Sequence, residues 1–513
     1  MFGHLTSAVS QVLPEIILLA AACVNLAVGP FLFGDSGQAA SGIRHRWGVW
    51  SLLALLLAGW CSLMPTPVIE ATELAPFQVD TLVWFVRLVT LVTGTVLVLT
   101  NWNQTTDNDA AESHACLLLI LAGANLIALA NDLVVLFLAL ELVSIPTYLF
   151  LYVARRDRSG QEATLKYFLL SIFSSALVLY GFSFLYGVAG TTNLTALHHV
   201  FKNYEFSAMP AMLLVSIVTI VCGLAFRITA VPFHFYAPDV FQGTATSAAA
   251  LLSFIPKVAG FIALVRLLGQ PSVESATHLG YWSLAAKSGD VLFLLSIATM
   301  FVGNLLALLQ KNVRRLLAYS SIAHAGYMLV GLSVAVSVPQ INDDATAAST
   351  GSIGGLPALL FYLGVYGVTT LGVFALIASL SRPERPLETS DDLAGLSKTH
   401  PAGAFLAAVL LFGLTGLPPT AGFLGKLTLF LSAWNHGTDL GRRLAICLAI
   451  NAAIAAWYYL RLIGVMYLQP SRDDTRRTTG VPAFVGVSLC AVASIALFFA
   501  PDWLWQALQR VGG

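Results

Sequence analysis

The sequence predicts an all-α polytopic membrane protein of about 14 transmembrane helices, arranged as an inverted repeat of two five-helix bundles that contain broken helices. Three observations lead to this prediction. First, 57% of the 513 residues are hydrophobic and only 10% are charged, whereas charged residues make up about 25% of soluble proteins. Second, the apolar residues are grouped into long runs. Third, prolines and charged residues recur inside several of those runs.

The apolar runs are long enough to cross a membrane, because about 20 helical residues span a hydrocarbon core about 30 Å thick. They lie near residues 13–33, 47–66, 81–100, 113–130, 133–155, 163–188, 210–236, 243–268, 289–309, 315–337, 356–380, 401–434, 441–468 and 481–502. An even number of crossings places both termini on one side. With the N-terminus outside, 14 Lys and Arg residues fall in inner loops and six in outer ones. The positive-inside rule therefore predicts that both termini lie on the non-cytoplasmic side.

The connections between the runs indicate a single domain covering residues 1–513. The longest, near 189–209, 338–355 and 381–400, are too short for an independent soluble domain. The seventh run breaks at Pro232, and the twelfth run breaks at Pro418-Pro419, five spans later. An odd offset between related helices implies opposite orientations.

We therefore expect a first repeat at about 113–268 and a second at about 289–468, with flanking helices at both ends.

Several function classes are disfavoured. The 26 basic and 26 acidic residues cancel, so the net charge does not suggest nucleic-acid binding. Six cysteines are scattered singly through apolar runs, without the spacing of a metal or iron–sulfur site. No phosphate-binding loop or dinucleotide motif is present. We therefore expect no metal or cofactor in this chain, and an energy source in an ion gradient or a partner.

The stretch 223–257 carries the strongest functional signal. Arg227 and Lys257 lie where the membrane is expected, and a basic side chain near the bilayer centre costs roughly 2.5–3.5 kcal/mol. Pro232 interrupts the helix between them, which lipid tolerates only where protein or water satisfies the freed backbone groups. The stretch therefore predicts a hydrated site inside a helix bundle.

Glu141 is the acidic counterpart, about eight residues into the fifth run. Helical spacing places Ser144, Ile145 and Tyr148 on the same face. One interpretation is that Glu141 pairs with a buried base and tunes its proton binding. The alternative is a static ion pair that fixes helix packing.

Lys257 and Lys426 are the candidate proton carriers. Lys257 lies near the middle of its run, too deep to reach the headgroups, and burial disfavours the charged form of a lysine. Lys426 follows the Pro418-Pro419 break and is expected to play the same part in the second half. Its alternative role is to cap the carbonyl groups that the break frees.

Two histidines are candidate relays between the halves. His234 and His324 both lie in apolar runs, and histidine titrates near neutral pH. The alternative for each is a hydrogen-bonded packing role. Arg227 cannot carry a proton, because a guanidinium stays protonated, and it is expected to act as a fixed charge.

Three further cations lie nearer the ends of their runs: Arg87, Lys166 and Arg461. A long basic side chain in such a position can extend to the headgroups. This interpretation and a functional one are both open for these residues.

Five motifs, in order along the chain, resemble a known family. They are Leu140-Glu-Leu-Val-Ser-Ile-Pro146, Leu165-Lys-Tyr-Phe-Leu-Leu170, Val231-Pro-Phe-His-Phe-Tyr-Ala-Pro-Asp-Val240, Arg315-Leu-Leu-Ala-Tyr-Ser-Ser-Ile-Ala-His-Ala-Gly-Tyr327 and Gly416-Leu-Pro-Pro-Thr-Ala-Gly-Phe-Leu-Gly-Lys426. Over nearly its whole length the chain resembles subunit N of the bacterial proton-pumping NADH:quinone oxidoreductase (respiratory complex I), an antiporter-like membrane subunit.

The resemblance implies 14 helices, with inverted repeats formed by helices four to eight and nine to thirteen. It implies proton translocation in the bacterial cytoplasmic membrane, driven by quinone reduction elsewhere in the complex. Flavin, iron–sulfur clusters and quinone would belong to partner subunits, so that this chain carries no redox centre itself. The implied neighbours are other membrane-arm subunits, including M-type and small K-type and J-type subunits, together with lipids.

Residue by residue, the resemblance implies proton-path roles for five side chains. Glu141 matches the fifth-helix glutamate, Lys166 the lysine that opens the sixth helix, and Lys257 the central lysine of the eighth. His324 matches the tenth-helix histidine and Lys426 the twelfth-helix lysine.

Arg227 departs from the family pattern, which usually has lysine at this position. This departure shifts the carrier role to Lys257. We hypothesise that Arg227 is a permanent partner of Glu141 and lowers the proton affinity of the lysine. The chain ends soon after its fourteenth run, without the long lateral helix of the L-type subunit, which favours the N-type.

Two alternatives belong to other classes. The first is a subunit of a multisubunit cation/proton antiporter that is not coupled to redox chemistry. The second is a purely structural helix bundle, which is disfavoured because a scaffold rarely retains several charges at the membrane midplane.

Overall fold

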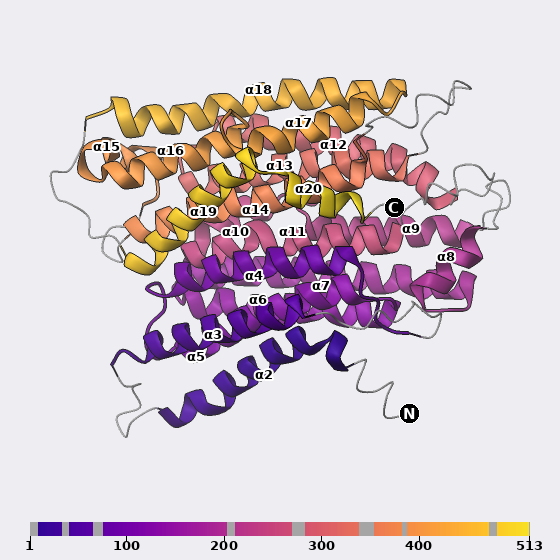
Figure 1. The fold of residues 1–513 in the computed structure, drawn as a ribbon, viewed down its shortest axis with the longest axis horizontal. Coiled ribbons are helices and arrows are strands. Elements are labelled where there is room, and N and C mark those ends of the chain that lie inside the picture. Colours follow the sequence, from indigo (N-terminus) through magenta and orange to yellow (C-terminus); the bar gives the residue numbers. More distant parts are fainter. Residues whose placement is uncertain are drawn as a thin grey trace.

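The computed structural model describes residues 9–32, 41–64, 75–202, 211–268, 283–337, 353–381, 387–470 and 480–511. Within these ranges the chain is helical, with three isolated β-bridges and no strand. Figure 1 shows the long helices lying side by side, roughly along the longest axis of the molecule. The start of α2 and the last helix, α20, both lie in the right-hand half of that view, as an even number of crossings requires.

Twelve described helices are long and apolar enough to cross a membrane. They are α2 (Leu13–Val28, continued by η1, Gly29–Leu32), α3 (Ile43–Leu63), α4 (Thr81–Asn101), α5 (Ala110–Leu129), α6 (Leu133–Ala154), α7 (Arg158–Ala189), α11 (Thr246–Leu268), α12 (Ser283–Leu308), α13 (Val313–Val336), α14 (Gly355–Leu380), α18 (Asp439–Leu468) and α19 (Val481–Phe499). Each of them overlaps one of the predicted apolar runs.

Two further crossings are broken helices. The first consists of α9 (Ala211–Arg227) and α10 (Ala237–Gly243), and the second of α16 (Pro401–Thr415) and α17 (Ala421–Trp434). Their breaks contain the prolines that predicted them. Together with the 12 continuous helices they complete the predicted 14 crossings. The pairing of these helices into an inverted repeat stays a prediction.

Short helices occupy some of the connections: α8 (Leu194–Lys202), η4 (Ser390–Leu393), α15 (Leu396–Thr399) and α20 (Asp502–Gln509). Capping residues extend two of the long helices beyond their apolar runs. The Asp157 carboxylate accepts the Gly160 N–H at 2.8 Å, so α7 begins at Arg158. The neighbouring Arg155 side chain donates to this carboxylate and lowers its pKa. In the same way Thr438 accepts from Gly441 N–H at the start of α18.

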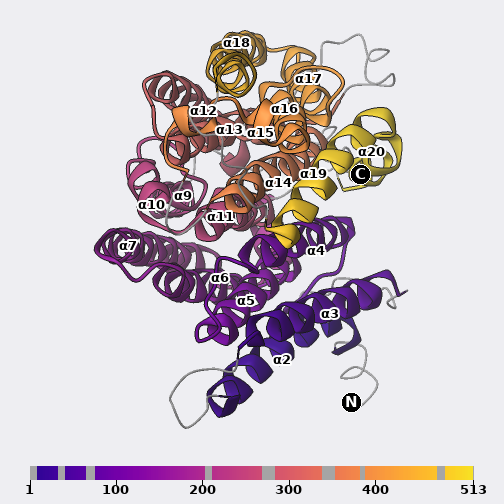
Figure 2. The same ribbon diagram turned by 90° about the vertical axis from the view of Figure 1, so that its left-hand side faces the viewer.

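The centre of the bundle consists of α11, α13 and α14. The apolar windows of α11 and α14 are fully buried within the protein, and that of α13 is 89% buried. Figure 2 shows α11 and α14 between the N-terminal helices on one side and α12, α16, α17 and α18 on the other. Because Lys257 is on α11 and His324 is on α13, both side chains are carried by helices that have little or no contact with lipid.

The outer helices α2, α3, α18 and α19 are only 33% buried in their apolar windows. Their outward side chains are large and apolar, such as Leu56, Trp60 and Trp457, which are 69%, 64% and 71% exposed. Such a surface is stable in hydrocarbon or against another apolar protein surface.

Candidate ion-translocation site

The predicted ion pair between Glu141 and Arg227 is present. Arg227 is the last residue of α9 and only 5% exposed. Its Nη2 lies 3.2 Å from Glu141 Oε1 and donates to Ser175 Oγ at 3.0 Å. Its Nη1 donates to Ser144 Oγ at 2.6 Å and to the Leu140 carbonyl at 3.2 Å. The guanidinium therefore binds α6 and α7 to the end of α9.

The face of α6 that carries Glu141 is only partly buried. Ser144 binds Arg227, and Tyr148 is buried and donates from its hydroxyl to Ser171 Oγ at 2.7 Å. Ile145, which helical spacing places on the same face, is 53% exposed, so only part of this face is buried. The Glu141 side chain is 22% exposed and lies at the edge of the buried side of α6. Ile145, four residues later, is therefore on the exposed side.

Lys257 lies in the middle of α11 and is fully buried. Its Nζ donates to Thr229 Oγ1 at 2.8 Å, and no ion pair with a described carboxylate is found. Thr229 belongs to the α9–α10 break and has a left-handed backbone, with φ 59°. Gly260, one turn after Lys257, permits the close approach, because a Cβ there would lie 2.5 Å from Ile228 Cγ2. The break thus supplies the hydroxyl group that faces the lysine.

Lys426 is also buried, at 6% exposure, on α17. Its Nζ donates to the carbonyl oxygens of Leu414 at 2.9 Å and Thr415 at 2.8 Å, at the end of α16. The ammonium also lies 4.9 Å from the centroid of the Tyr327 ring, within cation–π range. Lys426 therefore makes the carbonyl-capping contacts that the sequence suggested as its alternative role.

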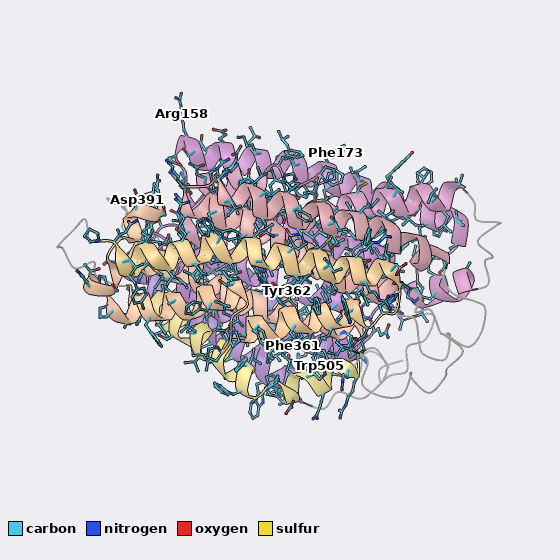
Figure 3. The ribbon with its side chains drawn as sticks, turned by 90° about the horizontal axis from the view of Figure 1, so that it is seen from above. Arg158, Phe173, Phe361, Tyr362, Asp391 and Trp505 are labelled. Atoms are coloured by element: carbon cyan, nitrogen blue, oxygen red, sulfur yellow. The ribbon has the colours of Figure 1, made fainter. Side chains whose placement is uncertain are left out.

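His324 is buried on α13, and both of its ring nitrogens have partners. Nδ1 lies 2.6 Å from the Tyr362 hydroxyl and Nε2 lies 3.0 Å from the Tyr459 hydroxyl, which also contacts Ser320 Oγ. Tyr362 lies near the middle of the molecule in Figure 3. A histidine bound at both nitrogens is held in one orientation and can pass a proton between its partners.

A polar bridge connects the helix of Lys257 with that of His324. The Ser253 carbonyl, one turn before Lys257, accepts from the Tyr366 hydroxyl at 3.2 Å. The same hydroxyl lies 2.8 Å from Ser321 Oγ, which can donate to it, and the Tyr366 ring lies against the imidazole with centroids 4.8 Å apart. The groups on α11, α13 and α14 are thereby joined through hydroxyls.

The sequence analysis missed these tyrosines and a buried amide network beside them. Asn304 Nδ2 donates to the Tyr327 hydroxyl and to Asn451 Oδ1, each at 3.0 Å, and Asn304 Oδ1 accepts from the Tyr458 hydroxyl at 3.1 Å. The available signal was the occurrence of asparagine inside two apolar runs, because amides inside a membrane require partners. Tyrosine is common in membrane proteins, so a tyrosine inside an apolar run does not by itself indicate a buried hydroxyl network.

Lys166 and His234 lie apart from these clusters. Lys166 is 42% exposed near the start of α7, where it pairs with Glu162 at 2.8 Å and Asp239 at 3.1 Å. His234 lies half-buried in the α9–α10 break, and its Nδ1 is buried without a hydrogen-bond partner. No hydrogen bond among the described residues joins His234 to His324, so a relay between them would require water.

For Arg87, the structure contradicts the interpretation that the side chain extends to the lipid headgroups. It is 5% exposed and forms a two-pronged pair with Glu15 of α2, with Nε–Oε1 2.8 Å and Nη2–Oε2 2.7 Å. The side chain points into the protein because a buried carboxylate meets it there, a partner that the sequence alone does not identify. Arg461, by contrast, is exposed on the outer face of α18, as the headgroup interpretation expects.

Among the described residues, no group of three or more His, Cys, Asp or Glu side chains is placed to hold a metal ion. The expectation that the chain carries no cofactor stays a prediction.

Comparisons with known proteins place this arrangement in a family. Residues 130–450 match the family described as "NADH:quinone oxidoreductase/Mrp antiporter, TM". The NADH-quinone oxidoreductase subunit N of Rhodospirillum rubrum is 34% identical over 501 residues, which are 97% of this chain and 95% of that protein.

Two solved structures extend the comparison. A chain of respiratory complex I from Thermus thermophilus with bound aureothin has a TM-score of 0.76 and 28% identity, covering 96% of this chain and 99% of that one. A chain of the Mrp complex from Dietzia sp. DQ12-45-1b has the same TM-score at 19% identity, covering 99% and 97%, which shows a common fold alone. By sequence and fold together, this chain belongs to the subunit N family of the NADH-quinone oxidoreductases.

Proposed function

We propose that this chain translocates protons as a membrane-arm subunit of an NADH:quinone oxidoreductase in the bacterial cytoplasmic membrane. The observation that carries the proposal is Lys257, a lysine at the centre of the fully buried helix α11 whose ammonium group meets a single hydroxyl. A charge buried with so little compensation is costly, and intramembrane ionisable groups are by default functional. The other buried clusters flank it.

The proposed route uses the groups in the order that their contacts suggest. Lys257 takes up and releases the proton, and the hydroxyls of Tyr366 and Ser321 lead from its helix toward His324. Tyr362 and Tyr459 orient His324. Lys426 then forms the end of the route in the second half, where the two carbonyls of the α16 end hold it in place. Water would complete the gaps between these groups.

The Glu141–Arg227 pair is proposed to adjust the charge around Lys257. Arg227 has four hydrogen-bond contacts with α6 and α7 and cannot lose its proton. Glu141 is therefore the only member of the pair that can change its charge. A change at Glu141 would alter the electrostatic field at the broken segment that carries Thr229, the partner of Lys257.

The chemistry that drives transport is assigned to partner subunits. In this proposal flavin, iron–sulfur clusters and the quinone site lie elsewhere in the complex, and enzymatic activity belongs to the whole assembly. The M-type, K-type and J-type subunits are the proposed neighbours. The excess of basic residues in one set of loops favours both termini on the non-cytoplasmic face.

A redox-coupled role is favoured over that of an independent cation/proton antiporter. The relative from Rhodospirillum rubrum is a quinone oxidoreductase subunit and matches nearly the entire chain at 34% identity. The Mrp complex shares the fold at only 19% identity. Co-purification separates the two, because a redox complex brings subunits with flavin and iron–sulfur clusters.

The test is redox-driven proton uptake in inverted membrane vesicles that carry Lys257→Met, with quinone reductase activity measured in the same sample. We expect both activities to fall together in an assembled complex, since a carrier has been removed from a coupled route. Lys398→Met, the same change at an exposed lysine, is the matched control and should retain both. Survival of pumping and electron transfer in Lys257→Met would refute the proposed route.

Arg227→Lys tests the fixed-charge role separately. Lysine can lose its proton and cannot reproduce the fork of contacts with Ser144, Ser175 and Glu141. We expect a change in the pH dependence or in the number of protons moved per NADH. If both quantities match the parent, Arg227 is not a fixed partner in the mechanism.

A further inference from the structure

A polar pocket opens at the end of the bundle where α7 begins. Its volume is about 380 Å³. Charged and polar side chains line it, among them Arg155, Ser159, Glu162, Lys166 and Asp239. In Figure 3 the label Arg158 marks this end of α7. Many of these side chains are partly exposed, Glu162 at 66% and Asp239 at 44%, so water and ions from the adjoining solution can enter the pocket.

Four aromatic rings pack together, two of them close to pocket residues in the sequence, and we call them the aromatic plug: Tyr148, Tyr167, Phe226 and Tyr236. Tyr167 follows the pocket residue Lys166 on α7. Its ring centroid is 5.8 Å from both Tyr148 and Tyr236, and Tyr236 stacks on Phe226 at 4.4 Å. Each of the four is at most 9% exposed. They come from α6, α7, α9 and the broken segment, so that they close the space among these elements.

Further along α7, on the side of the plug away from the pocket, the chain again carries polar side chains. Ser171 accepts from the Tyr148 hydroxyl at 2.7 Å. Ser175, two turns beyond Tyr167 on α7, contacts both Glu141 and Arg227. Eight residues of helix correspond to about 12 Å. The order along α7 is therefore pocket, plug, serines and the buried ion pair.

An ion triad holds the plug at its pocket side. Asp239 on α10 pairs with Lys166 of α7 at 3.1 Å and with Arg315 of α13 at 2.6 Å. Tyr236 precedes Asp239 by three residues and caps the start of α10, and its hydroxyl donates to the Phe226 carbonyl at 3.1 Å. A displacement of α10 would therefore move Tyr236 out of the plug.

We propose that the aromatic plug is a gate between the pocket and the Glu141–Arg227 pair, and that the triad of Lys166, Asp239 and Arg315 keeps it closed. This proposal rests on the proposed function, because the gate would control entry to the proton route. The gate itself can be tested without proton transport. In this proposal the packed rings exclude water from the space between the pocket and Ser171. When Asp239 loses its charge or its partners, α10 is released and a water chain can reach Ser171 and Ser175.

The gate is tested by the accessibility of a cysteine behind it. Ser171→Cys in the full chain, in membrane vesicles open on the pocket side, is treated with a cationic methanethiosulfonate reagent, and peptide mass spectrometry gives the rate at position 171. Ser159→Cys, in the pocket, is the control in front of the gate. We expect Ser159→Cys to react rapidly and Ser171→Cys to react slowly.

Two changes to the plug then separate its ring from its hydroxyl. Tyr167→Ala should raise the reaction rate at position 171 by about tenfold or more, because modification follows the population of the open state. Tyr167→Phe keeps the ring and should leave the rate within about twofold of the parent. Asp239→Asn should raise the rate through the triad while the rate at Ser159→Cys stays the same.

Either of two results would overturn the gate. One is a rate at Ser171→Cys equal to that at Ser159→Cys in the parent background, which would mean that the plug does not close. The other is a slow rate that Tyr167→Ala and Asp239→Asn leave unchanged. Because labelling needs no electron transfer, a failed gate and a failed proton pump are distinguishable in the same membranes.

Discussion

The two buried lysines, Lys257 and Lys426, lie beside the two broken helices but bind them differently. Lys257 meets one threonine hydroxyl, whereas Lys426 meets two backbone carbonyls and the face of a tyrosine ring. The difference follows from how each break satisfies its freed carbonyl groups.

At the first break the chain satisfies the end of α9 by itself. The carbonyls of Leu224, Ala225 and Phe226 accept backbone N–H groups from the three residues at 228 to 230, and Phe226 also accepts from the Tyr236 hydroxyl. At the second break the backbone turns sharply at Gly416 (φ 85°), and the carbonyls of Leu414 and Thr415 accept from Lys426. Lys426 thus also holds the second break together, whereas Lys257 caps no backbone carbonyl of the first.

The largest expected effect on stability is that of Lys426→Met. The change leaves two buried carbonyls unpaired, at about 1–3 kcal/mol each, and it removes the contact with Tyr327. Lys257→Met leaves only a threonine hydroxyl and removes a buried charge, so we expect a change within about 1 kcal/mol. Unfolding of the detergent-solubilised chain by denaturant measures both. Equal losses of unfolding free energy in the two variants would remove the distinction drawn between the lysines.

A smaller effect is expected for Thr229→Val, which deletes the hydroxyl partner of Lys257 at nearly constant shape. The expected loss is about 1–3 kcal/mol of unfolding free energy, because the bond joins an ammonium to a buried acceptor. We also expect slower proton uptake in vesicles. Thr229→Ser keeps the hydroxyl and should restore most of both properties. If valine matches the parent in stability and uptake, Lys257 does not depend on this contact.

The smallest effect concerns the ring beside Lys426. Tyr327→Leu removes the cation–π contact, worth about 0.5–2 kcal/mol, and also the hydroxyl that Asn304 binds. Tyr327→Phe keeps the ring and removes only the hydroxyl, so the difference in unfolding free energy between the two variants isolates the ring. Equal unfolding free energies of Tyr327→Leu and Tyr327→Phe would show that the contact between the Lys426 ammonium and the ring does not stabilise the protein.

Much of the fold could be predicted because the membrane imposes simple rules. The length of an apolar run determines whether it crosses. Pro232 and Pro418 mark breaks, whereas Pro146 and Pro256 lie inside the continuous helices α6 and α11. The ion pair of Glu141 and Arg227 was also predictable, since an acid and a base inside apolar runs require one another.

The remaining features depend on how each helix is rotated and which helix it faces. Arg87 binds Glu15 of α2, 72 residues away in the sequence, and no local pattern identifies that partner. Ile145 points outward because Glu141 lies at the edge of the buried side of α6 rather than at its centre. For Lys426, the carbonyl contacts depend on the path of the chain between α16 and α17.

The arginine at the end of α9 limits the charge states of its site. A pair made of glutamate and lysine can pass through net charges of −1, 0 and +1 as its two members titrate. With Arg227 in place the charge of −1 is excluded, because the guanidinium keeps its proton. The Glu141 site can therefore take only two net charges, neutral and singly positive, and has room for at most one exchangeable proton.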